Sequence, residues 1–480
     1  MERTGILLAF AVVALIVMAG IFGAVSISSQ HDDRFKVKVE IVEPEENAMI
    51  AGVITVKATF ESNSPAILAV LKIDDKIIGV SHEAPFHWEI DTTDYLDGEH
   101  AIMVMIRNEK GRIGVANSDI IINNGGTNVI IRSPTDGSSI SADFEVVVDA
   151  VSPRGLAYVR LDLDGQPVGN LTAAPFTFRL DSRTMDNGEH SLMAVACDEL
   201  GVTASASTTI WVSNPFSIID ERGKLIHFEG VPQRILSMGS SFTEVLYAIG
   251  ADDLIVGVDS SSKYPAQVSQ KINVGSFFTI NIEAILATNP DCIITWSFAT
   301  TSVATLESYG LKVVCYNPGS VSQVMDVIQS LGELTGHKND AKALIDNMNS
   351  RLEAVKARVA SVPVDQRPTV YFELRSTKSV GPGTIANELI TLAGGRNIYS
   401  TSTVKYPLFN SEYIINANPD VIIIEDQSTK TTEQIKSTAG WSEITAVKQD
   451  RILRINGELV SSTPRLVDAV EQMAEFFFPR

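Results

Sequence analysis

A stretch of about ninety residues occurs twice in succession, and this duplication constrains the fold more than any other feature of the chain. Matching residues lie 90 positions apart, as in Ala84-Pro85-Phe86 with Ala174-Pro175-Phe176, and Gly98-Glu99-His100 with Gly188-Glu189-His190. Within each copy, short segments of alternating polar and apolar residues are separated by turn residues at intervals of about ten, which is typical of antiparallel sandwiches. The sequence therefore predicts two all-β domains, at 36–123 and 127–213.

The two copies resemble the Ig-like surface domains of bacteria and archaea, which implies a sandwich fold for each. Asp97-Gly98 and Asn187-Gly188 predict hairpin turns, because such turns need residues that tolerate positive φ. His82 and His87 have no counterpart in the second copy, so a metal cluster with His100 is not favoured. The matching positions of His100 and His190 favour structural hydrogen bonds instead.

The N-terminal segment predicts export. Gly5 to Val25 contains 21 residues without a charge, and a helix of that length spans about 31 Å, the thickness of a bilayer core. Arg3 precedes the segment and acidic residues follow it, so the positive-inside rule places the rest of the chain outside the cytoplasm. We therefore predict that residues 1–30 form a single-pass transmembrane anchor, with a cleaved signal peptide as the alternative.

Composition excludes several function classes. Lys and Arg number 38 against 58 Asp and Glu, and the formal net charge of −20 would repel a nucleic-acid backbone. Three cysteines, Cys197, Cys292 and Cys315, form no disulfide framework and no CxxC motif. The sequence also lacks a G-x-S-x-G elbow, an HExxH helix and a P-loop, so no enzyme activity is predicted.

The region 216–480 has an α/β pattern in which strands and helices alternate, which predicts parallel sheets. Val321 to Ala360 reads as a long helical connector interrupted near Gly336, between a first lobe at about 234–320 and a second lobe at about 368–480. Such a connector would allow the lobes only a small hinge motion. The final helix is predicted to start at Pro464 and to bury one face, formed by Leu466, Val467, Val470, Met473 and Phe477.

The two lobes contain a second repeat. Asn281-Ile282-Glu283 and Asn289-Pro290-Asp291 return 129 positions later, as Asn410-Ser411-Glu412 and Asn418-Pro419-Asp420. In each lobe the first Asn suits an N-cap, and the glutamate falls in the first helical turn, where the macrodipole favours an anion. Helix capping alone explains either glutamate, but not its presence at the same place on both lobes.

Together these motifs resemble the class III substrate-binding proteins of ABC importers, within them the vitamin B12-binding and ferric-siderophore-binding members. Further residues that carry the resemblance are Ser241-Phe242-Thr243-Glu244, Tyr264-Pro265, Gly381-Pro382-Gly383-Thr384 and Thr463-Pro464-Arg465-Leu466. The resemblance implies a bilobal domain that passes its ligand to a permease dimer with its ATPase. It also implies that Glu283 and Glu412 dock into the two permease subunits.

The same resemblance implies the ligand contacts. Trp296 falls where B12-binding relatives carry a tryptophan, and Phe277 and Tyr406 stand where those relatives also have tryptophan. Ser261 replaces a tyrosine and Leu374 a phenylalanine, with Arg375 beside it. Aromatic faces suit a flat macrocycle, whereas His227 and His337 are too few for a bare transition-metal site.

We therefore expect an extracellular or periplasmic, membrane-anchored receptor that captures a corrinoid or a ferric siderophore and has no cofactor of its own. Arg375, Lys405 and Lys263 would suit anionic groups of such a chelate. The alternative is a cell-surface adhesion or scaffold protein built on the Ig-like repeats, which would not require the paired Glu283 and Glu412.

Overall fold

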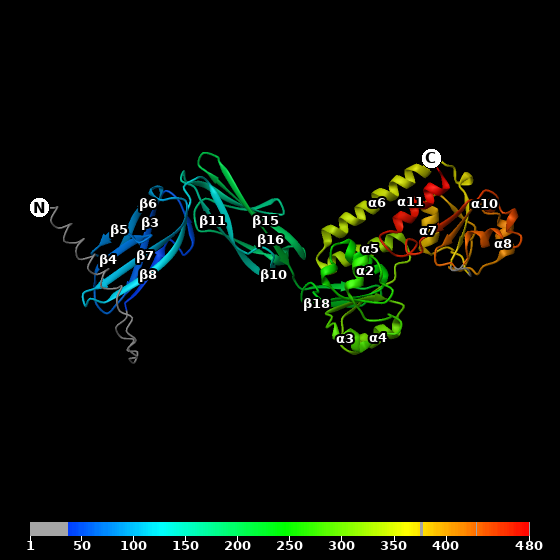
Figure 1. Cartoon of the computed structure of the whole chain (residues 1–480), viewed down its shortest axis with the longest axis horizontal. Helices are drawn as coiled ribbons and strands as arrows, with labels where there is room; N and C mark the ends of the chain where they lie inside the picture. The colour runs from blue at the N-terminus through cyan, green and yellow to red at the C-terminus, as the bar shows by residue number, and fades with distance from the viewer. Residues whose placement is uncertain (1–36, 375–377, 429, 480) are drawn as a thin grey trace. The chain divides into compact units, whose positions relative to one another are not determined.

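The computed structural model describes residues 37–374, 378–428 and 430–479. Among the described residues, strands are the regular elements from Lys38 to Val212, apart from two short 3-10 helices, and helices alternate with strands beyond Val212 (Figure 1). The predicted transmembrane segment lies outside the described residues. Within the described ranges, no helix has the length and apolar character needed to cross a membrane.

The first Ig-like domain consists of two sheets with strand orders β1-β3-β6 and β2-β8-β7-β4-β5. Buried side chains of both sheets, such as Val56, Phe86, Leu71 and Ile102, form one core. The strands are β1 (Lys38–Glu43), β2 (Ala48–Ile50), β3 (Val53–Glu61), β4 (Ala66–Ile73), β5 (Lys76–Ser81), β6 (Phe86–Asp91), β7 (Gly98–Asn108) and β8 (Ile113–Ile122).

The second Ig-like domain repeats this topology strand for strand, with orders β14-β11-β9 and β10-β16-β15-β12-β13. Even the short parallel pair recurs, because Ala48 pairs with Ile120 and Ser138 pairs with Ile210, both 90 positions later. The strands are β9 (Asn128–Ser133), β10 (Ser138–Ile140), β11 (Asp143–Val151), β12 (Leu156–Leu163), β13 (Gln166–Leu171), β14 (Phe176–Asp181), β15 (Gly188–Asp198) and β16 (Thr203–Val212).

The hairpin prediction at Asp97-Gly98 and Asn187-Gly188 was wrong. Gly98 begins β7, which pairs with β4 and β8, whereas the preceding β6 pairs with β3 in the other sheet. The tight two-residue turn instead joins β4 to β5 at Asp74 and Asp75, whose φ angles are 47° and 65°. Two consecutive positive φ angles suit the right-handed twist of the strands that they join.

The two histidines at matching positions of the repeat make structural hydrogen bonds, as predicted. The His100 imidazole contacts Asp74 Oδ2 through Nδ1 at 2.5 Å and the Leu96 carbonyl through Nε2 at 2.8 Å. His190 makes the matching contacts with Asp164 and with the carbonyl of Asp186. The His100 imidazole therefore links the β4–β5 turn to the start of β7, and the His190 imidazole links the β12–β13 turn to the start of β15.

The α/β domain begins with an antiparallel pair, β17 (Phe216–Ile219) and β18 (Leu225–Phe228). Lobe 1 is a parallel sheet of order β21-β20-β19-β22-β23. Its strands are β19 (Ile235–Met238), β20 (Ile255–Val258), β21 (Ile272–Asn273), β22 (Cys292–Trp296) and β23 (Val313–Tyr316), and its helices are α2 (Ser240–Ala248), α3 (Ile282–Ala287) and α4 (Thr300–Ser308).

Lobe 2 is a second parallel sheet, of order β25-β24-β26-β27. Its strands are β24 (Thr369–Glu373), β25 (Arg396–Asn397), β26 (Val421–Glu425) and β27 (Ile452–Ile455), and its helices are α7 (Ile385–Leu392), α8 (Ser411–Ala417), α9 (Thr432–Lys436) and α10 (Thr445–Lys448). The two parallel sheets confirm the bilobal α/β prediction.

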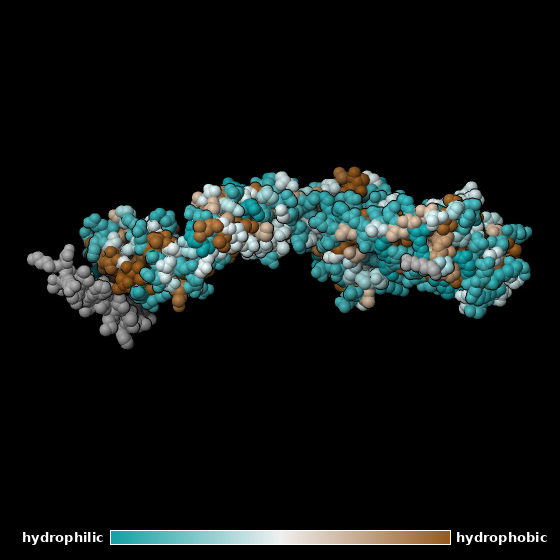
Figure 2. Space-filling view, turned by 90° about the horizontal axis from the view of Figure 1, so that it is seen from above, coloured by the Kyte–Doolittle hydropathy of each residue, from teal (hydrophilic) through white to brown (hydrophobic). Residues whose placement is uncertain are grey.

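The predicted connector is two helices, α5 (Val321–Thr335) and α6 (Lys338–Ala360), separated by Gly336 in the left-handed conformation at φ 74°. The last helix, α11 (Leu466–Phe477), buries its five predicted apolar residues. One continuous core cluster includes residues of both sheets, α5, α6 and α11, so the connector is packed into both lobes rather than suspended between them. Hydrophilic residues cover most of the face of this domain that Figure 2 shows.

Candidate functional site

The 129-residue repeat corresponds to the same local structure in both lobes. The side chain of Asn281 accepts a hydrogen bond from Ala284 N at 3.1 Å, and that of Asn410 accepts one from Tyr413 N at 3.0 Å, so both are N-caps as predicted. Asn289 and Asn418 end the two helices with φ angles of 45° and 43°. α3 and α8 are therefore equivalent elements, and each precedes the equivalent interior strand of its sheet, β22 or β26.

Both predicted docking glutamates are exposed in the first turn of these helices. Among the described residues, the capping hydrogen bonds of these two helices are made by Asn281 and Asn410 and not by the glutamates. In the described parts of the chain, neither carboxylate takes part in an ion pair. Each lobe thus presents one solvated negative charge from the same structural position.

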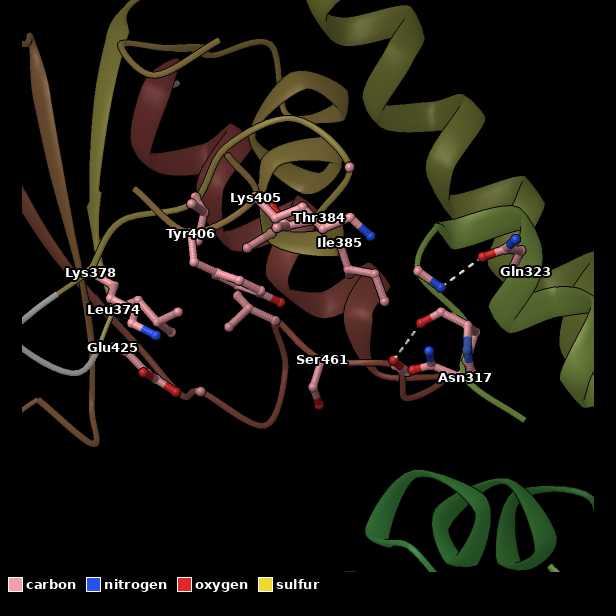
Figure 3. Close-up of a pocket in the computed structure, with 18 of the residues that line it drawn as sticks. Asn317, Gln323, Leu374, Lys378, Thr384, Ile385, Lys405, Tyr406, Glu425 and Ser461 are labelled. Atoms are coloured by element: carbon pink, nitrogen blue, oxygen red, sulfur yellow. Dashed lines mark hydrogen bonds between the residues drawn. The ribbon is translucent and has the colours of Figure 1, made fainter. Parts of the chain in front are cut away.

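A cavity of about 930 Å³ opens at the carboxyl ends of the strands (Figure 3). Leu374 follows β24, Glu425 ends β26 and Gly457 lies just beyond β27, all in lobe 2. Asn317 follows β23 of lobe 1 and lines the same cavity. The carboxyl ends of both parallel sheets therefore border it, which is where open α/β sheets bind ligands.

The lining combines an aromatic ring with charges of both signs. Tyr406 is 49% exposed, and Figure 3 shows its ring pointing into the cavity between Leu374 and Thr384. Lys378 and Lys405 supply exposed ammonium groups. Glu221 also lines the cavity, and partial burial raises the pKa of its carboxyl.

Lobe 1 contributes a second group of aromatic rings at the ends of its strands, here called the aromatic platform: Phe277, Phe278, Trp296 and Phe298. Trp296 is the last residue of β22, and its ring lies stacked at 5.4 Å from that of Phe298. Phe277 and Phe278 lie 6.2 Å and 6.0 Å from Phe298. Buried Phe242 supports the platform from below, with its ring centroid 4.5 Å from that of Trp296.

The predicted ligand residues thus fall into separate groups. Tyr406 and Leu374 line the cavity, whereas Trp296 and Phe277 belong to the aromatic platform. Ser261 is exposed, but its hydroxyl donates to the buried carboxylate of Asp259 at 2.5 Å, so this hydroxyl is not free to donate to a ligand. Arg375 lies outside the described residues.

Sequence reasoning missed Phe278, Phe298 and Lys378. Phe278 and Phe298 are 66% and 48% exposed, which is unusual for such large apolar rings. A run of aromatic residues directly after predicted parallel strands was the available signal. Lys378 stands apart from any motif, and only its place in the fold brings it to the cavity.

Comparison with known proteins agrees with this geometry. Residues 235–459 match the periplasmic binding protein family, and residues 128–194 match the bacterial Ig domain family. An ABC transporter substrate-binding lipoprotein of Bacillus subtilis is 29% identical over 279 residues, covering 55% of this chain and 86% of the relative. A vitamin B12-binding protein of Vibrio cholerae is 29% identical over 250 residues, covering 51% and 88%. A cobalamin-binding protein of Halobacterium salinarum is 26% identical over 276 residues, covering 55% and 74%.

Two lobes of parallel sheet, a helical connector packed into both and a cavity at the strand ends, together with these relatives, indicate a solute-binding protein of the kind that serves ABC importers. Over residues 235–459 the chain is similar to the periplasmic binding protein family, and a region similar to bacterial Ig domains precedes it.

Proposed function

We propose that this protein captures a corrinoid or another large metal chelate outside the cytoplasm and delivers it to an ABC importer, without catalysing a reaction itself. The observation that carries the proposal is the cavity of about 930 Å³ bordered by the strand ends of both lobes. Its volume lies at the upper end of the range for small-molecule sites. A single metal ion or amino acid would leave most of this space empty.

The lining chemistry favours a ligand with both flat apolar and anionic parts. Tyr406 offers a ring face in the cavity, and the aromatic platform offers further ring faces on lobe 1, outside the cavity lining. Aromatic side chains bury about 150–250 Å² each against an apolar partner. Lys378 and Lys405 offer charge-assisted hydrogen bonds to a phosphate or carboxylate. The macrocycle and phosphate of cobalamin satisfy both, and two of the relatives are named for this ligand. Ferric siderophores and heme are the competing chelates.

Glu283 and Glu412 are assigned to the permease dimer by the same proposal. A two-fold symmetric transporter presents the same surface twice. Two equivalent exposed carboxylates on equivalent helices match that requirement. A scaffold protein would have no use for this duplication, so the alternative of an adhesion role is disfavoured.

The N-terminal segment and the Ig-like domains complete the proposal. Residues 5–25 would hold the protein in the membrane, and the two Ig-like domains would form a stalk between that anchor and the α/β domain. The ligand-binding half would then stay close to its importer without diffusing away.

Isothermal titration calorimetry of the purified protein with cyanocobalamin, hemin and a ferric hydroxamate tests the ligand. We expect saturable one-to-one binding of cyanocobalamin with micromolar or tighter affinity, and weaker binding after Lys405→Ala or Tyr406→Ala. Lys448→Ala is the matched control, because Lys448 is exposed on lobe 2 outside the cavity and pairs with Glu443. Binding of none of the three chelates, or equal loss in the control, would refute the proposal.

A further inference from the structure

The two lobes are joined by a largely buried ion pair between helix α2 of lobe 1 and the start of α11 of lobe 2. Both carboxylate oxygens of Glu244, on α2 of lobe 1, accept hydrogen bonds from Arg465, at 2.8 Å from Nε and 2.7 Å from Nη2. The side chains are only 6% and 20% exposed. Such a bidentate, desolvated geometry fixes both position and orientation.

The lobe 1 side of this contact is held rigidly. The Arg465 guanidinium also lies 3.6 Å from the centroid of the Tyr264 ring, a cation–π contact. The loop that carries Tyr264 is anchored by Ser262, whose hydroxyl donates to buried Asp259 at 2.6 Å and lies 2.8 Å from Thr243 Oγ1 of α2. Glu244 and Tyr264 therefore belong to one fixed unit.

On the lobe 2 side, the segment just before Arg465 forms part of the cavity wall. Gly457, Val460, Ser461 and Ser462 line the cavity, and this segment, residues 457–462, ends three residues before Arg465. The Ser462 hydroxyl donates to the carbonyl of Pro318 at 3.2 Å, which is a second link to the lobe 1 side. Glu458, in the same segment, lies 3.2 Å from Arg465 Nη2.

We propose that the Arg465–Glu244 pair is an interlobe clamp that fixes the width of the cavity and positions its wall at 457–462. The clamp sets how often the cleft opens and therefore how fast a bound ligand leaves. Arg465 is a positioning residue, since it lies outside the cavity lining and acts through the segment before it. The effect on ligand exchange rests on the function proposed above, but the effect on lobe spacing does not.

The appropriate variant removes both partners. Loss of Arg465 alone would leave the buried Glu244 carboxylate unpaired, which destabilises the fold regardless of any clamp. The double variant Glu244→Leu/Arg465→Met replaces the pair by apolar side chains of similar size, a change that folds generally tolerate. The matched control is Arg351→Met, because Arg351 pairs with Asp468 and Glu471 on the same α11, outside the cavity lining.

Lobe spacing is measured by spin labels on the full-length protein. The three native cysteines are buried, so Ala287→Cys and Asn416→Cys, both at exposed positions, introduce one accessible label in each lobe. We expect a narrow distance distribution in the parent protein and in Arg351→Met, and a distinctly broader one in the double variant. A distribution as narrow as that of the parent would overturn the clamp.

Ligand exchange supplies the second measurement, with cyanocobalamin as the probe. In the double variant we expect dissociation to accelerate about tenfold, which corresponds to about 1.4 kcal/mol, with no such change in Arg351→Met. If the dissociation rate is unchanged although the distance distribution broadens, the clamp does not control ligand exchange. If the parent binds no cyanocobalamin, the proposed ligand is wrong, while the label distances still decide whether the clamp exists.

Discussion

Charge reversal at Glu283 and Glu412 should separate importer docking from helix capping. The two N-caps are filled by Asn281 and Asn410, so each glutamate contributes only its interaction with the helix macrodipole, typically about 0.3–1 kcal/mol. Each reversal removes this favourable interaction and adds an unfavourable one of similar size, so Glu283→Arg together with Glu412→Arg should lower the free energy of unfolding by about 1–4 kcal/mol. That loss lies below the roughly 5–15 kcal/mol typical of a folded domain, so the variant should remain folded.

The effect at the importer is expected to be far larger. A hydrogen bond to a charged group contributes about 1.5–3 kcal/mol, and losing two of them weakens binding roughly 10²- to 10⁴-fold, before any like-charge repulsion is added. The single reversals should each cost about half of that free energy. The affinity for the chelate should stay within about twofold, because neither glutamate lines the cavity.

The assay compares binding of the loaded protein to its permease–ATPase complex in nanodiscs with chelate binding by calorimetry. Glu433→Arg is the matched control: Glu433 is also exposed in the first turn of a lobe 2 helix, α9, but it has no partner in the 129-residue repeat. If Glu433→Arg weakens importer binding as much as the double reversal, or if chelate affinity falls in parallel with importer binding, the docking argument fails.

Two further outcomes follow from particular contacts. Burial lowers the pKa of His100, but its hydrogen bonds to Asp74 and Leu96 raise it more, so the net pKa lies above 6.5. Thermal unfolding should therefore show that the first Ig-like domain loses stability as the pH rises from about 6.5 through that higher value. The variant His100→Gln should abolish this pH dependence. A Cβ at Gly239 would lie 2.7 Å from Trp296 Nε1, so Gly239→Ala should displace the aromatic platform and change tryptophan fluorescence; unchanged spectra would contradict this placement.

The features predicted correctly from the sequence are those that depend on a few residues with a required backbone conformation or hydrogen bond. Asn289 and Asn418 adopt left-handed backbone, and Asp291 and Asp420 accept hydrogen bonds from the start of the neighbouring strand in each lobe, from Arg234 N and Thr369 N. Such positions tolerate few residue types, so the repeat remained visible. The connector and its break at Gly336 were predictable for the same reason, since a helix end in left-handed conformation favours glycine.

Other features depend on tertiary contacts that no local sequence pattern indicates. The hairpin turn at Asp74-Asp75 was missed because Asp-Gly at 97–98 is the stronger local signal, although tertiary structure places it at a crossover between sheets. Arg465 and Glu244 are 221 residues apart, and neither lies in a motif that indicates an ion pair. Exposure of Phe278 and Phe298 is likewise a property of the folded lobe.

The connector packed into both lobes has a consequence for uptake as a whole. If the separation between α3 and α8 barely changes when the guest enters, an importer sees almost the same pair of negative charges on an empty receptor as on a full one. Vacant receptors would then occupy transporters and compete with loaded ones. The rate of import would depend on the ratio of receptors to transporters in the membrane as well as on the supply of the chelate.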